Sequence, residues 1–167
     1  MSQKLDDTFF ADECLEVSKK LVGKILACRA EDGTVLRLRI SETEAYCGEQ
    51  DTACHAHKGK TARTEVLYRA PGTIYVYLCY GIHWLLNIVT GREGQPQAVL
   101  IRACVDAEGP GKLTKKLGID NKLSIGSCPD LWVEDDDCQF DIEELPRVGI
   151  AYASPEDQAR LWRFKMK

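Results

Sequence analysis

The chain has 167 residues, of which 44% are hydrophobic and 29% charged, and its formal net charge at pH 7 is −4. This length and composition are typical of one globular domain, residues 1–167. No apolar run approaches the roughly 20 residues of a membrane-spanning helix, so we expect no membrane partner. The first residues are polar and acidic, unlike a signal peptide, and we expect a cytoplasmic, nucleoid-associated or nuclear protein.

The first 40 residues predict one helix followed by a β-hairpin. The helix spans residues 12–24, where apolar side chains recur at helical spacing. The hairpin strands are residues 24–29 and 34–40, and the turn between them contains Asp32 and Gly33, a pair typical of hairpin turns. In the second strand apolar residues alternate with polar ones, so that successive side chains point to opposite faces.

The segment Glu42-Thr-Glu-Ala-Tyr46 follows this second strand directly. If the alternation continues, Glu42, Glu44 and Tyr46 lie on the face of the apolar residues that end at Ile40. A carboxylate in a core-facing row is costly unless it is paired or used in chemistry. A strand that ends at the surface would carry the same glutamates at no cost. The pattern leaves both interpretations open, and it does not choose between Glu42 and Glu44.

Residues 47–70 lose all periodicity, and a long connection of this kind in a small domain is often functional. The chain has eight cysteines but no C-x-x-C pair, so we expect no disulfide framework and mostly buried, apolar cysteines. One cluster has the chemistry of zinc ligands without the spacing of a structural zinc site, and it consists of Cys47, Cys54, His55 and His57. A metal-dependent hydrolase that uses this cluster is therefore an alternative interpretation.

The charges are unevenly distributed. Residues 134–144 contain seven acidic residues and no basic one, and without them the rest of the chain would be positive. Basic residues gather in residues 58–69 and 112–122. Such a run is either a solvated surface or a footprint for DNA phosphates, and for the second case Lys112 and Lys115 are the candidates for backbone contacts. We expect the acidic segment to face away from DNA.

Residues 73–80 and 82–90 form the most apolar part of the chain and predict a second hairpin. Tyr75 and Tyr77 share one face by their spacing, whereas Tyr80 lies on the other face near the tip. Packing in a core explains tyrosines in strands well. An aromatic residue at a hairpin tip is harder to bury, and a wedge inserted into stacked nucleic acid is one use for it.

Residues 98–105 predict a central strand, apolar on both faces except for Arg102, which needs a carboxylate, a phosphate or a carbonyl nearby. The elements expected after it are a loop with a short helix (109–118), an irregular acidic segment (124–145), a strand (146–152), a helix beginning at Ser154 and an edge strand (161–164).

Several motifs in a fixed order resemble the alkyladenine (methylpurine, 3-methyladenine) DNA glycosylase family. The resemblance extends from Phe9 to Phe164, which is nearly the whole chain. The motifs are Glu42-Thr-Glu-Ala-Tyr46, Pro71-Gly-Thr-Ile-Tyr-Val-Tyr-Leu-Cys-Tyr-Gly81, Asn87-Ile88, Val99-Leu-Ile-Arg102 and Gly109-Pro-Gly-Lys-Leu113.

The resemblance implies a monomeric base-excision-repair enzyme that acts on double-stranded DNA containing damaged purines. Such an enzyme flips an alkylated or deaminated purine out of the duplex and hydrolyses the N-glycosidic bond with an activated water, without lyase activity, cofactor or metal. The implied fold is one α+β domain with a curved, mostly antiparallel sheet, peripheral helices and a protruding β-hairpin. A non-catalytic DNA-binding module on the same scaffold is a further alternative.

The resemblance also assigns roles to individual residues. Glu44 would be the general base that deprotonates the attacking water, and Arg102 would help to hold that water, which leaves Glu42 a supporting role. Tyr80 would enter the minor groove and fill the gap in the base stack. The residues expected to form the base pocket are Tyr46, His55, Tyr77, Asn87 and Leu100.

Overall fold

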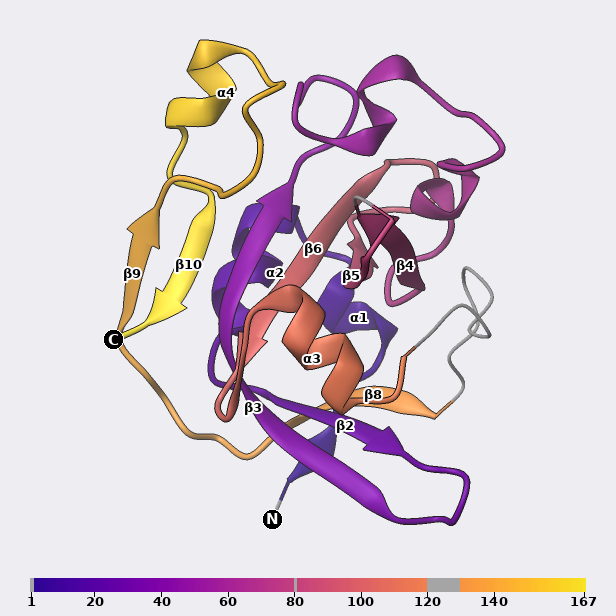
Figure 1. Cartoon of the computed structure of the whole chain (residues 1–167), viewed down its shortest axis with the longest axis vertical. Helices are drawn as coiled ribbons and strands as arrows, with labels where there is room; N and C mark the ends of the chain where they lie inside the picture. The colour runs from indigo at the N-terminus through magenta and orange to yellow at the C-terminus, as the bar shows by residue number, and fades with distance from the viewer. Residues whose placement is uncertain (1, 80, 120–129) are drawn as a thin grey trace.

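The computed structural model describes residues 2–79, 81–119 and 130–167, which form an antiparallel sheet with short helices on its faces (Figure 1). The strands are β1 (Gln3–Lys4), β2 (Ile25–Arg29), β3 (Val35–Tyr46), β4 (Ile74–Cys79), β5 (His83–Thr90), β6 (Gln97–Cys104), β7 (Ala107–Glu108), β8 (Leu131–Asp135), β9 (Ile142–Leu145) and β10 (Arg163–Met166). The helices are α1 (Asp7–Phe10), α2 (Cys14–Leu21), α3 (Pro110–Lys116) and α4 (Pro155–Ala159), with 3-10 turns η1 (His55–Lys58) and η2 (Glu65–Tyr68).

The 10-stranded sheet runs in the order β1-β8-β2-β3-β6-β5-β4, and β10 adds to β3, β9 to β10 and β7 to β6. Within the described part of the chain, each of these pairs is antiparallel. In Figure 1 the helices α1 and α2 lie behind the sheet and α3 lies in front of it. The α+β class with a mostly antiparallel sheet is therefore confirmed. None of the described helices is long and apolar enough to cross a membrane.

Strand β3 lies at the centre of the sheet, and it is longer than expected. It does not end at residue 40 but continues to Tyr46, pairing first with β2 and then with β6. Its register with β6 shifts between Ile40 and Glu42 and again between Glu42 and Thr43. Such irregularities interrupt the alternation of faces. The expected continuation of one face from Ile40 to Tyr46 is therefore wrong, although Glu42 and Glu44 do lie on the same face, beside Arg102.

Helix α2 covers the opposite face of β3. Its side chains Val17 and Leu21 are fully buried, and the hydroxyl of Ser18 lies 2.8 Å from the hydroxyl of Thr43 on the strand. The helix is shorter than the predicted 12–24 because the chain becomes extended at Val22 and then reaches φ +94° at Gly23, a left-handed conformation that favours glycine. Because Thr43 faces α2, its neighbour Glu44 points to the other side of the sheet.

Both predicted hairpins are confirmed among the described residues. Strands β2 and β3 pair from Ile25↔Arg39 to Arg29↔Val35 around the Asp32-Gly33 turn. Strands β4 and β5 pair from Ile74↔Ile88 to Cys79↔His83. The tip residue Tyr80 lies outside the described residues. Strand β6 is the expected central strand, and the predicted helices after Gly109 and Ser154 are present as α3 and α4.

Three predictions for the last third of the chain are wrong. The acidic segment is not irregular throughout, because it contains β8 and β9. Residues 146–152 form a loop with bends and a turn rather than a strand. The closing strand β10 is not an edge strand, because it pairs with β3 on one side and β9 on the other.

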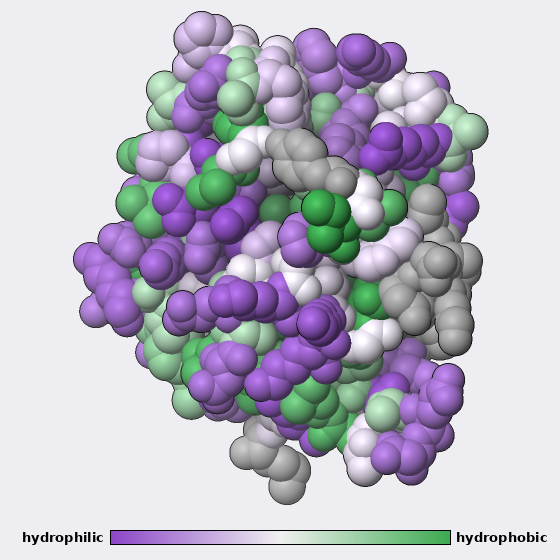
Figure 2. Space-filling view, in the orientation of Figure 1, coloured by the Kyte–Doolittle hydropathy of each residue, from purple (hydrophilic) through white to green (hydrophobic). Residues whose placement is uncertain are grey.

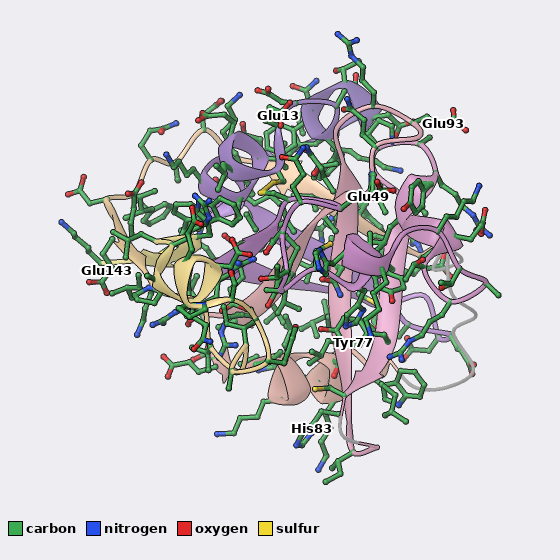
Figure 3. All side chains as sticks on the ribbon, turned by 90° about the horizontal axis from the view of Figure 1, so that it is seen from above. Glu13, Glu49, Tyr77, His83, Glu93 and Glu143 are labelled. Carbon is green, nitrogen blue, oxygen red and sulfur yellow. A yellow bond between two sulfur atoms is a disulfide. The ribbon has the colours of Figure 1, made fainter. Side chains whose placement is uncertain are left out.

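Residues of the acidic segment form ion pairs with basic residues of the β2–β3 hairpin. Arg37 and Arg39 on β3 donate to Glu134 and Asp136, with shortest N–O distances of 3.0 and 2.6 Å. Glu143, in the same segment, lies well away from Tyr77 in Figure 3. Local sequence could not reveal these pairs because their members are 97 residues apart.

The cysteines also differ from expectation. Cys14 at the start of α2 and Cys47 just after β3 form a disulfide across 33 residues. Nothing in the sequence indicated this single disulfide, which ties α2 to the end of β3. Among the described cysteines, those not in a disulfide are Cys28, Cys54, Cys79, Cys104 and Cys138.

Candidate active-site cleft

A cleft of about 580 Å³ opens on the side of the sheet away from α2, between β3, β4, β6, the start of α3 and the loop after β9. Its volume is in the usual range for ligand pockets. Its lining includes six residues that the sequence placed in the site, namely Glu44, Tyr46, His55, Tyr77, Leu100 and Arg102. A smaller pocket of about 20 Å³ adjoins it, and Tyr46, His55 and Tyr77 line both.

Strand register aligns these side chains. Glu44 pairs with Leu100, Leu100 with Asn87, and Asn87 with Tyr75, so one row crosses β3, β6, β5 and β4. Residues two positions along a strand share a face. The next positions on the same face are therefore Tyr46, Arg102 and Tyr77. Four strands converge on one cleft because the sheet places distant segments in register.

The Glu44 carboxylate is fully buried at the wall of the cleft. Its Oε1 accepts a hydrogen bond of 2.9 Å from the Tyr46 hydroxyl, and its Oε2 accepts one of 2.7 Å from the backbone N–H of Val148. Nη1 of Arg102 lies 3.9 Å from Oε1, too far for a good hydrogen bond. Burial raises the pKa of Glu44, and Arg102, the Val148 amide and the Tyr46 hydroxyl oppose that rise only in part.

Arg102 makes its direct ion pair with the other glutamate. Nε of Arg102 and Nη1 of Arg163 each lie 3.0 Å from Oε1 of Glu42. Glu42 thus supports the site by orienting Arg102, whose remaining charge faces Glu44. The sequence left a carboxylate, a phosphate or a carbonyl open as the partner of Arg102, and the structure places two carboxylates beside it.

Aromatic rings form the other wall. The rings of His55 and Tyr77 meet edge to face with centroids 4.3 Å apart, and Tyr75 lies 5.5 Å from Tyr77. The Tyr75 hydroxyl lies 3.1 Å from Nδ1 of His55. Burial, followed by the charge of Arg63, lowers the pKa of His55, which favours a neutral imidazole. Tyr75 and Tyr77 share one face, as their spacing predicted.

Asn87 lies deeper than the other expected pocket residues. It lines the smaller pocket, is 3% exposed, and its Nδ2 donates to the carbonyl oxygens of Tyr75 and Leu85 at 3.3 and 3.4 Å. These two bonds hold the amide against the β4–β5 hairpin. Asn87 therefore shares the smaller pocket with Tyr46, His55 and Tyr77 but does not line the larger cleft.

The two lysines expected to contact DNA occupy different positions. Lys112 is exposed and lines the mouth of the cleft, whereas Lys115 is exposed on α3 outside it. Figure 2 shows this face with hydrophilic residues around small groups of hydrophobic ones. Figure 3 shows His83 on the same side of the molecule as Tyr77, and both line the cleft.

The alternative metal site is not assembled. The sulfur of Cys47 is bonded to Cys14 and is therefore no ligand. Within residues 2–79, 81–119 and 130–167, no three His, Cys, Asp or Glu side chains are arranged to hold a metal ion. His57 is exposed and its Nδ1 lies 2.8 Å from the Glu49 carbonyl oxygen.

Sequence reasoning missed several residues of the site. Val148 and Tyr152 lie in the segment wrongly predicted as a strand, and both line the cleft. The hydroxyl of Tyr152 donates to the Ala53 carbonyl at 2.7 Å, which joins this loop to the segment after β3. Their role depends on a loop whose N–H points at Glu44, and no local pattern predicts that.

Comparisons with known proteins identify the family of this chain. The family described as Methylpurine-DNA glycosylase (MPG) matches residues 8–106 and 106–167. A protein of Psychrobacter cryohalolentis is 44% identical, covering 92% of this chain and 87% of its own length. A protein of Methanocella arvoryzae is 42% identical, covering 93% of this chain and 88% of its own length. A protein of Borreliella afzelii is 41% identical, covering 96% of this chain and 94% of its own length. All three bear the name "Putative 3-methyladenine DNA glycosylase".

Proposed function

This chain belongs to the methylpurine-DNA glycosylase family, and on that premise we propose that it flips damaged purines out of duplex DNA and hydrolyses their N-glycosidic bond with a water activated by Glu44. It is a DNA-3-methyladenine glycosylase, a hydrolase of base excision repair. The observation that carries the proposed mechanism is the buried Glu44 carboxylate, which lies beside Arg102 at the wall of an aromatic cleft.

The environment of Glu44 suits a general base. Its pKa is raised by burial, so the carboxylate is a better proton acceptor than a solvated one, and Arg102 favours the ionised form. A water between Glu44 and the sugar would lose its proton to Glu44 as it attacks C1′, while the base departs with the bonding electrons. The negative carboxylate also stabilises the positive charge that develops on the sugar.

The aromatic wall suits an extruded purine. Tyr46 and Tyr77 offer ring faces, and a positively charged base such as 3-methyladenine gains about 0.5–2 kcal/mol from such contacts. The neutral His55 can hydrogen-bond to the base edge, and Asn87 in the adjoining smaller pocket is suited to reject the exocyclic amine of guanine. Tyr80, which lies outside the described residues, is the proposed wedge.

We propose a hydrolytic reaction without a covalent amine intermediate. That alternative needs a lysine at the reacting sugar. Lys112 lies at the cleft mouth and is exposed, which suits contact with DNA phosphates instead. Release of the base with an intact abasic strand is the expected product, and a borohydride-trapped protein–DNA adduct would contradict it.

The test is base release from duplexes carrying single alkylated or deaminated purines. We expect Glu44→Gln to lower the single-turnover rate about 1,000-fold, because general base catalysis contributes roughly 10²–10⁴-fold. The variant should still bind duplex DNA with an abasic site. Base release by Glu44→Gln at the wild-type rate would remove Glu44 from the mechanism.

A chelator distinguishes the metal-dependent alternative. The wild type should release bases at the same rate after exhaustive treatment with EDTA. Loss of activity that returns on addition of Zn²⁺ would favour a metal-dependent hydrolase. Binding of lesion DNA without any base release by the wild type would favour a non-catalytic DNA-binding module.

A further inference from the structure

Behind the cleft lies an ion pair that is shut off from solvent. The side chains of Arg147 and Asp51 are 0% and 1% exposed. Nη1 and Nη2 of Arg147 donate to the two carboxylate oxygens of Asp51 at 2.6 and 3.0 Å, a bidentate geometry. Neither residue lines the cleft.

Stability alone does not explain such a pair. Removing two charges from water costs about as much as their attraction returns, and well-packed apolar residues often do as well in the same place. The surroundings of a buried pair therefore indicate its use. Here the pair contacts the Glu44–Tyr46 segment at Ala45 and Tyr46 and the chain directly after it at Cys47.

Arg147 contacts this segment directly. Its Nη1 donates to the carbonyl oxygen of Ala45, the residue between Glu44 and Tyr46, at 3.0 Å. Its guanidinium lies 5.0 Å from the centre of the Tyr46 ring and 4.9 Å from that of Trp162. Since Tyr46 lines the cleft and Arg147 does not, the guanidinium supports the ring from the side away from the cleft.

The next residue reaches Glu44 itself. Val148 donates its backbone N–H to Oε2 of Glu44 at 2.7 Å. Residues 146–152 form a loop rather than a strand, and the side chain of Arg147 anchors this loop at the residue before that N–H, beside the hydrogen bond from Arg163 to the Pro146 carbonyl. Nη2 of Arg147 also donates to the carbonyl oxygen of Asp157 at 3.4 Å, which ties the loop to α4.

Asp51 holds the other side of the arrangement. Its carboxylate accepts hydrogen bonds from the backbone N–H groups of Cys47 and Ala53, both at 3.0 Å. The chain that leaves Tyr46 is thus bound to the same ion pair as the loop that carries Val148. Two segments about 100 residues apart meet at one buried charge pair.

We propose that Asp51 and Arg147 are positioning residues that hold the Glu44 carboxylate and the Tyr46 ring in their catalytic places from behind the cleft. The proposal rests on the proposed function for its kinetic consequence. Catalysis is sensitive to such placement, because a shift of about 1 Å can cost roughly 100-fold in rate. Loss of the pair should therefore slow base release far more than it weakens DNA binding.

The experiment compares Arg147→Lys, Arg147→Met and the double variant Asp51→Asn/Arg147→Met. The double variant removes both charges together, so that no unpaired charge is left buried. We expect single-turnover base release to fall about 10-fold in the lysine variant and about 100-fold in the other two, since a lysine keeps the charge without the bidentate geometry. Affinity for an abasic duplex should stay within about threefold of wild type.

The matched control is Arg39→Met/Asp136→Asn, which removes a bidentate pair between β3 and the residue after β8, outside the lining of the cleft. This variant should release bases at the wild-type rate. Base release by the folded Asp51→Asn/Arg147→Met variant at that same rate would overturn the proposal. So would equal losses of rate and abasic-DNA affinity, which indicate a merely structural pair.

A crystal structure of the double variant provides a readout that does not depend on activity. We expect the Glu44 carboxylate and the Tyr46 ring to move from their wild-type positions. Unchanged positions would overturn the positioning role, even if the wild type released no base. An inactive wild type whose double variant shows the displaced carboxylate would count against the proposed function alone.

Discussion

The two halves of strand β3 use charge in opposite ways. Near the hairpin, Arg37 and Arg39 neutralise Glu134 and Asp136. Hydrogen bonds from Arg37 above all lower the pKa of Glu134 to about 2. At the cleft, burial raises the pKa of Glu44. The first carboxylate is therefore committed to structure, whereas the second remains ready to take a proton.

The difference arises from the donors that each carboxylate receives. Glu134 accepts two hydrogen bonds from Arg37, one from Ser2 and one from Trp132. Glu44 accepts two, both from uncharged groups, while its nearest cation is shared with Glu42. A buried carboxylate without a hydrogen bond from a cation keeps much of the free-energy cost of desolvation. That cost raises its pKa and makes the ionised form a better proton acceptor.

Among changes to the partners of the two carboxylates, we expect Arg102→Met to have the largest effect on activity. Glu44 would lose its nearest cation and become protonated over a wider pH range, so base release at pH 7 should fall about 100-fold. Arg39→Met, on the other half of the strand, should leave the single-turnover rate within about twofold. Equal rates for the two variants would show that the cation beside Glu44 is dispensable.

Lowering the pH should separate the two regions. Glu44 acts when ionised, and its pKa is raised, so activity is lost as pH falls through a value above the usual carboxyl range of about 4.3. The contribution of Glu134 to stability is present above that range and is lost only as pH falls towards about 2. As the pH is lowered from 8 to 2, the rate of base release should therefore fall first, and the melting temperature should fall at lower pH. Coincident losses would contradict the assignment.

The smallest expected effects concern stability, and they have opposite signs. Glu134→Gln should lower the free energy of unfolding by about 1–2 kcal/mol, because hydrogen bonds to a charged partner are lost. Glu44→Gln should raise the melting temperature at pH 7, because a raised pKa means that ionised Glu44 destabilises the fold there. Thermal melts of both variants at pH 7 test this. A lower melting temperature for Glu44→Gln would indicate a structural carboxylate.

Local signals predicted much of the fold. The Asp32-Gly33 turn, the alternation after it and the Ser154-Pro155 helix start each depend on a few neighbouring residues, and each is present. The side chain of Ser154 accepts from the N–H of Asp157, as a helix cap does. The strand predicted at 146–152 is absent because Arg147 and the N–H of Val148 bond to the side chains of Asp51 and Glu44 rather than to a neighbouring strand.

The site was accessible to sequence only through its motifs. Those motifs named Glu44, Arg102, Tyr46, His55 and Tyr77 among others, and the structure brings these five to one cleft. They did not indicate Asp51 or Arg147, since an acidic residue in a loop and an arginine after a proline are ordinary surface features in a sequence. Burial of both was visible only once the two loops had met.

The sequence by itself determined the two hairpins, the central strand β6 and the residue types available for catalysis, because those depend on neighbours along the chain. The tertiary structure decided the burial, the hydrogen-bond partners and the pKa of the Glu44 carboxylate. The N–H that binds it comes from a residue 104 positions away, and the arginine that offsets its burial pairs with a glutamate 60 positions from it. The pKa of a carboxylate depends on its neighbours in space. For Glu44 those neighbours are set in part by the register shifts between β3 and β6.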